Sequence, residues 1–154
     1  MKYVKLILVF ILISSHASFS EEFQYITVGP IFHWYFQSST GKCFTYGCEF
    51  SYWKTTNGVP FSIDIGFESA KTLEASYIYS ELQTGIPVVG ISIGGTLEMS
   101  QNNYRMGFQS TIWGGAFLFG AFRYRRFSGI SQYGPGAYVK IPIYSSDNNY
   151  GLRM

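Results

Sequence analysis

The sequence contains few charged residues, and its basic residues form no cluster. Charged side chains make up 13% of the 154 residues, about half of the ~25% that is usual for soluble domains. The formal net charge is only +2, which is too small to hold a polyanion, so we exclude a nucleic-acid-binding protein. Low charge together with 19% aromatic residues also excludes a disordered chain.

Cysteine and histidine are too scarce for a disulfide framework or a typical metal site. The chain has two cysteines, Cys43 and Cys48, and His33 is the only histidine after the first twenty residues. Within one extended strand the two cysteines would lie ~16 Å apart at ~3.3 Å per residue, whereas a disulfide needs Cα atoms within ~7 Å. A loop before the strand would remove this obstacle, so their pairing stays open. A lone histidine predicts no metal ligand set, and we expect no cofactor.

Long apolar segments are also missing, with one exception at the N-terminus. Residues 6–13 are all apolar, but a transmembrane helix needs ~20 such residues. Two lysines precede this segment and small residues follow it, so residues 1–20 predict a secretory signal peptide, cleaved after Ala17 or Ser20. The same two lysines account for the formal charge of +2, and the mature chain is therefore neutral.

The rest of the chain is dominated by alternation of apolar and polar residues, which is typical of β-strands with one apolar face. The clearest example is residues 61–68, which read Phe-Ser-Ile-Asp-Ile-Gly-Phe-Glu. Related patterns occupy residues 25–37, 44–52, 73–80, 89–99, 104–112, 117–127 and 136–144. Short turn-forming segments separate these eight strands, so each strand is expected to pair antiparallel with the next. We predict one barrel domain over residues 21–144 and a polar tail over residues 145–154.

Three features favour a barrel whose apolar face points outward to lipid. The polar face is rich in Gly, Ser and Thr, which suit the crowded interior of an eight-stranded barrel. The strands are about ten residues long, as a tilted membrane span requires. Aromatic residues lie toward strand ends and predict interfacial girdles. These are Tyr25, Trp34, Phe36, Phe44, Tyr52, Trp53, Tyr79, Tyr104, Trp113, Tyr124, Phe127 and Tyr144.

The signal peptide, the eight alternating strands and the aromatic outer face resemble the small eight-stranded outer-membrane barrels of the OmpA/OmpX kind. The resemblance implies an all-β, eight-stranded antiparallel up-and-down transmembrane β-barrel in the outer membrane of a Gram-negative cell. It also implies a monomer whose partner is outer-membrane lipid. Many such barrels end in an aromatic residue that the assembly machinery reads. Tyr144 ends the last predicted strand here, but the chain continues for ten more residues.

The phase of each strand predicts which charged side chains point into the lumen. The predicted set is Glu49, Asp64, Glu68, Glu74, Glu98, Arg105, Arg123, Arg125 and Lys140. The acids come from the second to fifth strands and the bases from the sixth to eighth, so barrel closure would place opposite charges face to face. Because enclosed charges must be paired, we predict an ion-pair network that closes the lumen. Glu98 and Arg105 flank one turn symmetrically and are expected to be cross-strand neighbours.

Catalytic residues are harder to find. His33, Ser51 and Glu49 share the predicted inner face of neighbouring strands, which makes them weak candidates for a hydrolytic trio. Three functions therefore stay open. The first is an outer-membrane barrel with a structural or interaction role. The second is a barrel enzyme that modifies outer-membrane lipid. The third is a secreted lipocalin-like barrel that binds an apolar ligand and has its apolar face inside.

Overall fold

A computed structural model describes residues 24–37, 41–56, 59–86, 88–101, 103–115 and 118–145 of the chain. The predicted signal peptide of residues 1–20 lies outside these ranges, and so does the predicted tail beyond residue 145. Within the described residues, no helix is both long and apolar enough to cross a membrane.

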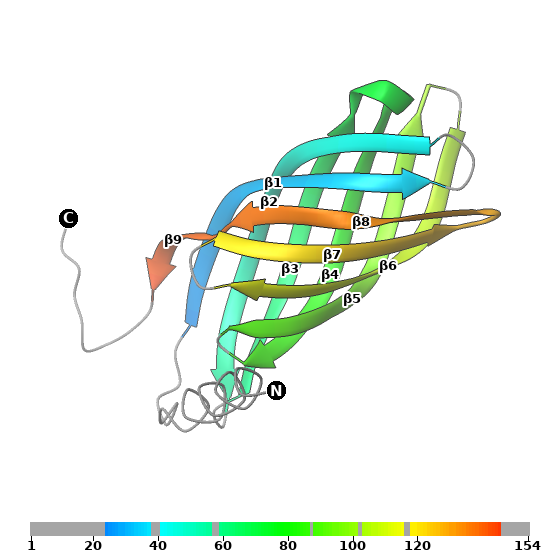
Figure 1. The fold of residues 1–154 in the computed structure, drawn as a ribbon. Helices are drawn as coiled ribbons and strands as arrows, with labels where there is room; N and C mark the ends of the chain where they lie inside the picture. Colours follow the sequence, from blue (N-terminus) through cyan, green and yellow to red (C-terminus); the bar gives the residue numbers. More distant parts are fainter. Residues whose placement is uncertain are drawn as a thin grey trace, which may run out of the picture.

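The described chain is a closed barrel in which each strand pairs antiparallel with the next, except for the last two, which both pair with the first (Figure 1). The strands are β1 (Gln24–Gln37), β2 (Gly41–Thr56), β3 (Val59–Ala70), β4 (Ala75–Ile86), β5 (Val89–Ser100), β6 (Asn103–Gly115), β7 (Leu118–Phe127), β8 (Ile130–Val139) and β9 (Ile141–Ser145), with a short 3-10 turn η1 (Lys71–Leu73) between β3 and β4. The barrel closes because β1 pairs with β2 on one side and with β8 and β9 on the other. Only Lys140 separates β8 from β9, so they form one interrupted strand. The predicted eight-stranded antiparallel up-and-down barrel is thus confirmed.

The eighth strand begins earlier than the sequence suggested. Its expected start is residue 136, whereas β8 starts at Ile130 and pairs with β7 along its whole length. The segment Gly134-Pro135-Gly136 carries little apolar alternation, which hid the first half of this strand. Backbone pairing to β7 holds it extended without a strong side-chain pattern.

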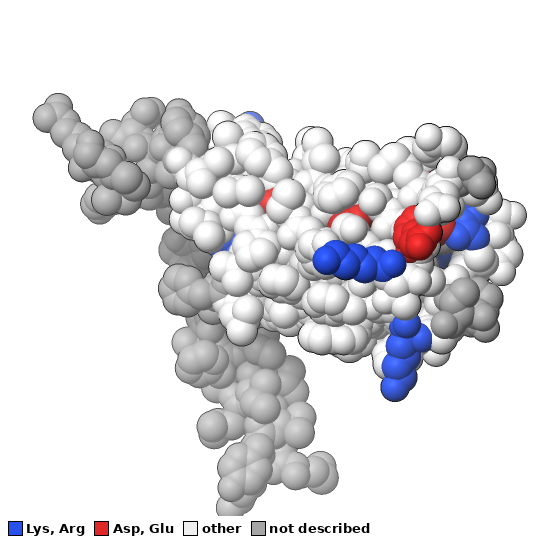
Figure 2. Space-filling model, turned by 90° about the horizontal axis from the view of Figure 1, so that it is seen from above, with Lys and Arg blue, Asp and Glu red and all other residues white. Residues whose placement is uncertain are grey.

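Seven of the eight strands have the inside and outside faces expected from the alternation. On β3, for example, Phe61, Ile63, Ile65 and Phe67 are exposed while Asp64 is fully buried. Figure 2 shows the result on one face of the molecule, where most of the surface is neither acidic nor basic and the large charged side chains gather toward one end. The two cysteines also lie on opposite faces of β2, with Cys43 buried and Cys48 exposed. Both are free thiols.

The phase predicted for β4 is wrong. The sequence suggested that Tyr77 and Tyr79 point outward, but both are buried and Ile78 is exposed instead. Ile78 is the one residue that breaks the apolar–polar alternation of residues 73–80, and this residue points outward. The inner face of β4 therefore carries Tyr77, Tyr79, Glu81 and Gln83. On this strand the aromatic side chains point into the barrel and not toward its outer surface.

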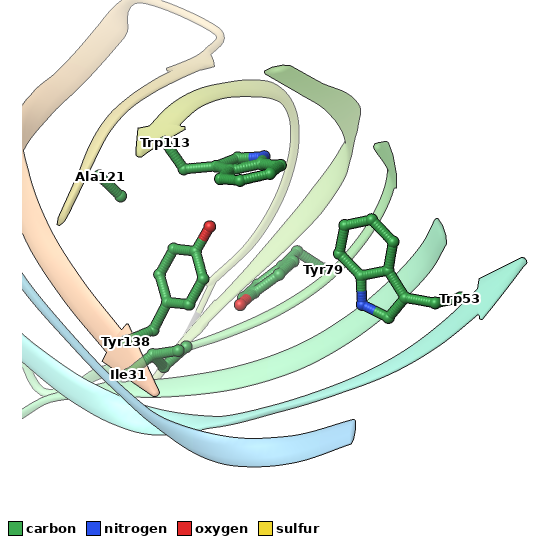
Figure 3. Packing of buried hydrophobic residues seen from close by; sticks show 6 residues of the cluster. All are labelled: Ile31, Trp53, Tyr79, Trp113, Ala121 and Tyr138. Atoms are coloured by element: carbon green, nitrogen blue, oxygen red, sulfur yellow. The ribbon is translucent and has the colours of Figure 1, made fainter. Parts of the chain in front are cut away.

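Several aromatic residues expected in the interfacial girdles lie inside the barrel. Trp53, Tyr79, Trp113 and Phe127 are all buried. Figure 3 shows three of them in one cluster with Ile31, Ala121 and Tyr138, all pointing into the barrel from different strands. The rings of Trp53 and Trp113 meet edge to face with centroids 6.3 Å apart. These rings fill the end of the lumen at which β1 begins, and the aromatic excess is therefore shared between the outer surface and the core.

Two glycines make room for large inward side chains on the neighbouring strand. Gly66 lies opposite Tyr79 in the register of β3 and β4, and a Cβ at Gly66 would come within 2.1 Å of the Tyr79 ring. Gly136 lies opposite His33, and a Cβ there would come within 2.0 Å of the imidazole. Small residues beside large ones are how a narrow barrel fits its interior.

Candidate functional site: the charged interior of the barrel

The centre of the lumen is organised around Glu68 on β3. Its Oε1 atom lies 2.5 Å from Arg123 Nη1 and 2.6 Å from Arg125 Nη2, both on β7. Its Oε2 atom accepts a hydrogen bond of 2.6 Å from the Thr45 hydroxyl on β2. All four side chains are almost fully inaccessible to solvent. One carboxylate thus joins two arginines across the barrel, in the short charge-assisted bonds that enclosed charges need.

Arg123 extends this contact to two further strands. Its Nη2 atom lies 3.4 Å from Glu81 on β4 and 3.5 Å from Glu49 on β2. Its Nε atom donates to the Thr111 hydroxyl at 2.8 Å, and that hydroxyl donates to Glu81 at 2.9 Å. A single guanidinium therefore links β7 to β2, β3, β4 and β6.

A second cation, Lys140, lies in the break between β8 and β9. Its ammonium group is 3.1 Å from Glu49 and 3.4 Å from Asp64, and it donates to the Ser51 hydroxyl at 2.9 Å. Glu49 also accepts a hydrogen bond of 2.6 Å from the Tyr79 hydroxyl. The Lys140 side chain points inward, as the phase of the strand predicts, and its nitrogen is held by the two acids.

Aromatic rings pack against the buried guanidinium groups of Arg123 and Arg125. The Arg125 guanidinium lies 4.9 Å from the ring centroid of Tyr35 and 4.7 Å from that of Tyr77. Arg123 lies 4.4 Å from the Tyr79 ring. Cation–π contacts of this kind gain strength when the cation is desolvated. The inward rings of β4, Tyr77 and Tyr79, therefore stabilise the two arginines of the charged network by direct contact.

Nearer the opposite end, Glu98 and Arg105 are direct partners in the register of β5 and β6 and form an ion pair. Glu98 is buried, but the Arg105 side chain is 26% exposed. This pair lies beside the mouth of the barrel at the end where β5 leads into β6. It is separate from the contacts of Glu68 and Arg123.

Eight of the nine charged residues assigned to the lumen from the sequence point into the barrel, and Glu74 does not. Glu74 is exposed on the turn after η1, where its backbone is left-handed with φ of 47° and its carboxylate accepts a hydrogen bond from Gln101. The inverted phase of β4 explains the error. The same inversion hid Glu81, which is buried beside Arg123. If Ile78 is assigned to the outer face, the alternation of the strand places Glu81 on the inner face.

The central network has more acids than bases among the described residues. Glu49, Asp64, Glu68 and Glu81 face three cations, which are Arg123, Arg125 and Lys140. His33 Nδ1 lies 3.7 Å from Glu68. Carboxylate oxygens of Glu49, Asp64 and Glu81 approach within 4.8 Å of one another. Each of these three carboxylates lies within ion-pair distance of Arg123 or Lys140, so side chains of the protein supply positive charge to this group.

The structure does not bring His33, Ser51 and Glu49 together as a hydrolytic trio. The imidazole of His33 is fully buried, stacks on Tyr35 with centroids 5.3 Å apart, and makes no hydrogen bond within the described chain. Ser51 and Glu49 are instead held by Lys140. A catalytic histidine must lie within hydrogen-bond reach of its nucleophile, and the described residues include no such bond from His33 to Ser51.

The distribution of polarity also contradicts a lipocalin-like interior. The lumen contains the ion pairs described above, whereas the exposed residues include Ile63, Ile65, Leu82, Ile91 and Ile93. An apolar ligand in the lumen would have to displace paired charges, which is unfavourable.

Comparisons with known proteins support the fold. No known protein family matches this sequence, and no curated protein matches it either. Among solved structures, a de novo designed transmembrane β-barrel is similar with a TM-score of 0.50 and 9% identity, over 75% of this chain and 95% of the designed one. Neisserial surface protein A has a TM-score of 0.46 and 12% identity, over 77% of this chain and 97% of that protein. The likeness to the designed barrel agrees with the closed eight-stranded barrel described above, and the chain has a transmembrane β-barrel fold.

Proposed function

We propose that this protein is an outer-membrane barrel with a structural or interaction role, whose lumen is closed by the buried ion-pair network. The observation that carries the proposal is the inverted distribution of polarity. Arg123, Arg125 and Glu68 are among the most deeply buried side chains, while most large aliphatic residues of the strands are exposed. Water outside the barrel would disfavour this arrangement, and a bilayer would favour it.

The extent of the apolar exterior supports the bilayer as its surroundings. Exposed Ile and Val residues occur on both β3 and β5, β3 adds two exposed Phe residues, and Ile112, Leu118 and Phe122 extend the surface over β6 and β7. Soluble monomers rarely expose apolar patches larger than ~300–600 Å². The strands from β1 to β7 contain 10 to 16 residues, which meets the ~9–11 residues that a tilted membrane strand needs.

The network supports a closed barrel rather than a pore. Arg123 contacts acids on three strands of the opposite wall, and Lys140 joins β2 and β3 to the break between β8 and β9. The buried aromatic cluster around Trp53 and Trp113 further supports a lumen that is filled by side chains. The outer surface is then the part of the molecule that meets partners, and we propose outer-membrane lipid as the first of them.

The location follows from the same reasoning. Secretion through the predicted signal peptide of residues 1–20, followed by its cleavage, would deliver a neutral chain to the outer membrane of a Gram-negative cell. One closed barrel has no unpaired strand edges, so we propose that it acts as a monomer.

Heat-modifiable migration tests the membrane assignment. The protein is extracted with detergent, and unheated and boiled samples are compared by SDS gel electrophoresis. The folded barrel is expected to migrate differently from the boiled chain, and to precipitate when detergent is removed. A protein that stays monomeric and soluble without detergent would refute the proposal.

Conductance tests the closed lumen separately. The protein is reconstituted into planar bilayers, and we expect no steady single-channel current. The control is Arg123→Ala, which removes the guanidinium that crosses the lumen and is expected to produce current in barrels that remain folded. Steady current through the unchanged protein would contradict the closed lumen and leave the membrane assignment intact.

A further inference from the structure

The outer surface of the barrel has a groove over β2, β3, β4 and β5, at the end where β1 begins and β9 ends. Its volume is about 550 Å³, within the ~300–1,000 Å³ that is typical of ligand pockets. Its walls are outward-facing side chains and are predominantly apolar. Its lining consists of Tyr52, Lys54, Phe61, Ser62, Ile63, Leu82, Gln83, Thr84, Ile91, Ser92 and Ile93.

The strand register determines how the residues that line the groove are arranged. The outward side chains form two adjacent rows across the four strands. The first row is Lys54, Phe61, Thr84 and Ile91, and the second is Tyr52, Ile63, Leu82 and Ile93. Ser62, Gln83 and Ser92 lie between the rows, and their side chains are buried toward the lumen, so only backbone underlies the groove at these positions.

Thr84 is the smallest outward side chain in these rows. Its neighbours across the strands are Phe61 and Ile91, and Leu82 lies next to it along β4. The Thr84 hydroxyl donates a hydrogen bond of 3.0 Å to the Pro60 carbonyl. Because the hydroxyl donates its hydrogen bond to the backbone, Thr84 adds no free donor to the hollow between the larger residues.

A single cation, Lys54, stands at one edge of this apolar groove. It lies opposite Gln24, the first residue of β1, and two residues before β2 ends at Thr56. Among the described residues no carboxylate lies within ion-pair distance of Lys54. The one described acid that is exposed, Glu74, belongs to the turn at the opposite end of the barrel. Within the part of the chain that the structure describes, the edge of the groove therefore carries a positive charge without an acidic partner, at the level of a strand end.

We propose that this groove binds one glycerophospholipid, with an acyl chain between the two rows and the phosphate on the Lys54 ammonium. The inference rests on the membrane location proposed above. A lysine on a lipid-facing surface is unfavourable in hydrocarbon and extends toward the headgroups, which places Lys54 where a phosphate lies. The lipid phosphate pairs with the Lys54 ammonium, and the acyl chain covers the apolar side chains that line the groove.

The proposal is tested by native mass spectrometry of the folded barrel in a non-ionic detergent, titrated with phosphatidylglycerol. The unchanged protein is expected to retain one lipid. Ile63→Trp fills the groove and is expected to abolish retention. Lys54→Gln removes the charge and is expected to weaken binding about fivefold, the contribution of one lysine at an anionic membrane surface. Diacylglycerol, which lacks the phosphate, is expected to bind both the unchanged protein and Lys54→Gln equally.

The chain offers a matched control for each variant. Ile65→Trp changes the next outward isoleucine on β3, which is exposed but does not line the groove. Lys42→Gln changes the exposed lysine at the other end of β2. Both controls are expected to retain the lipid. Equal loss from Ile63→Trp and Ile65→Trp, or full retention by Ile63→Trp, would overturn the proposal. A heat-modifiability gel on each sample separates this outcome from failure of the membrane assignment, in which no variant would show the folded form.

Discussion

Replacing Glu68 with glutamine tests the buried network at the point where most contacts meet. The substitution keeps the size of the side chain and removes its negative charge. Arg123 and Arg125 both lie within 2.6 Å of the same oxygen of Glu68. In the Glu68→Gln variant, neither arginine would keep its shortest ion pair, and both arginines are almost fully inaccessible to bulk solvent.

The expected cost is large because the charges left behind are enclosed. Removing one partner of a buried ion pair destabilises a protein by ~3–5 kcal/mol. Arg123 keeps Glu49 and Glu81 at 3.4–3.5 Å, which moderates the loss, whereas Arg125 has Glu68 as its only ion-pair partner among the described residues. We therefore expect the free energy of unfolding to fall by about 4 kcal/mol, roughly a thousandfold change in the folding equilibrium.

Urea titration of barrels refolded into lipid vesicles, followed by tryptophan fluorescence, measures this loss. Glu98→Gln is the control, because its partner Arg105 is 26% exposed and can turn to water, so we expect a cost of about 1 kcal/mol or less. Adding Arg125→Gln to Glu68→Gln is expected to restore part of the stability, since it removes the stranded charge. A loss for Glu68→Gln no greater than that for Glu98→Gln would refute the reasoning.

Three further predictions concern packing, lipid exposure and thiol access. Gly66→Ala is expected to destabilise the barrel by about 1–3 kcal/mol, because its Cβ would meet the Tyr79 ring, whereas Gly95→Ala has no atom within 4 Å and is expected to be neutral in the same urea titration. Ile65→Arg, at the middle of β3, is expected to cost ~2–4 kcal/mol in vesicles, and Val59→Arg at the strand end ~0–1 kcal/mol; equal costs would contradict a lipid-facing surface. A small maleimide that partitions into detergent is expected to add one label to the folded protein, at exposed Cys48, and two after unfolding, when buried Cys43 becomes accessible. Two labels on the folded protein, counted by mass spectrometry, would show that Cys43 is not enclosed.

The accuracy of the sequence analysis depended on how regular each strand was. On β3, four apolar residues alternate strictly with polar ones, so the inward positions of Asp64 and Glu68 followed directly. On β4, Ile78 and two tyrosines compete for the apolar face, and period 2 alone does not decide between them. A tyrosine suits either face, because its ring packs against apolar groups and its hydroxyl bonds polar ones.

In the candidate site too, some contacts could be predicted from the sequence and others could not. Glu98 and Arg105 were expected as neighbours because they flank a short turn, and they are direct partners. The contact between Glu68 and Arg125 joins residues 57 positions apart and depends on how far the strands are staggered when the barrel closes. No local sequence pattern predicts the stagger of the strands, because it is determined when the whole barrel closes.

The sequence by itself determined the strands, their antiparallel order and the faces of those with strict alternation, because period 2 and turn chemistry act between residues that are close in the chain. The tertiary structure alone decided that the tyrosines of β4 point inward, that Glu81 replaces Glu74 in the network, and that Lys140 reaches Glu49 and Asp64 from a break in the last strand. It also decided where the outer surface is hollow beside Lys54. These features arise when distant strands are brought into register around a closed barrel, so that each inward side chain must fit the ones across the lumen.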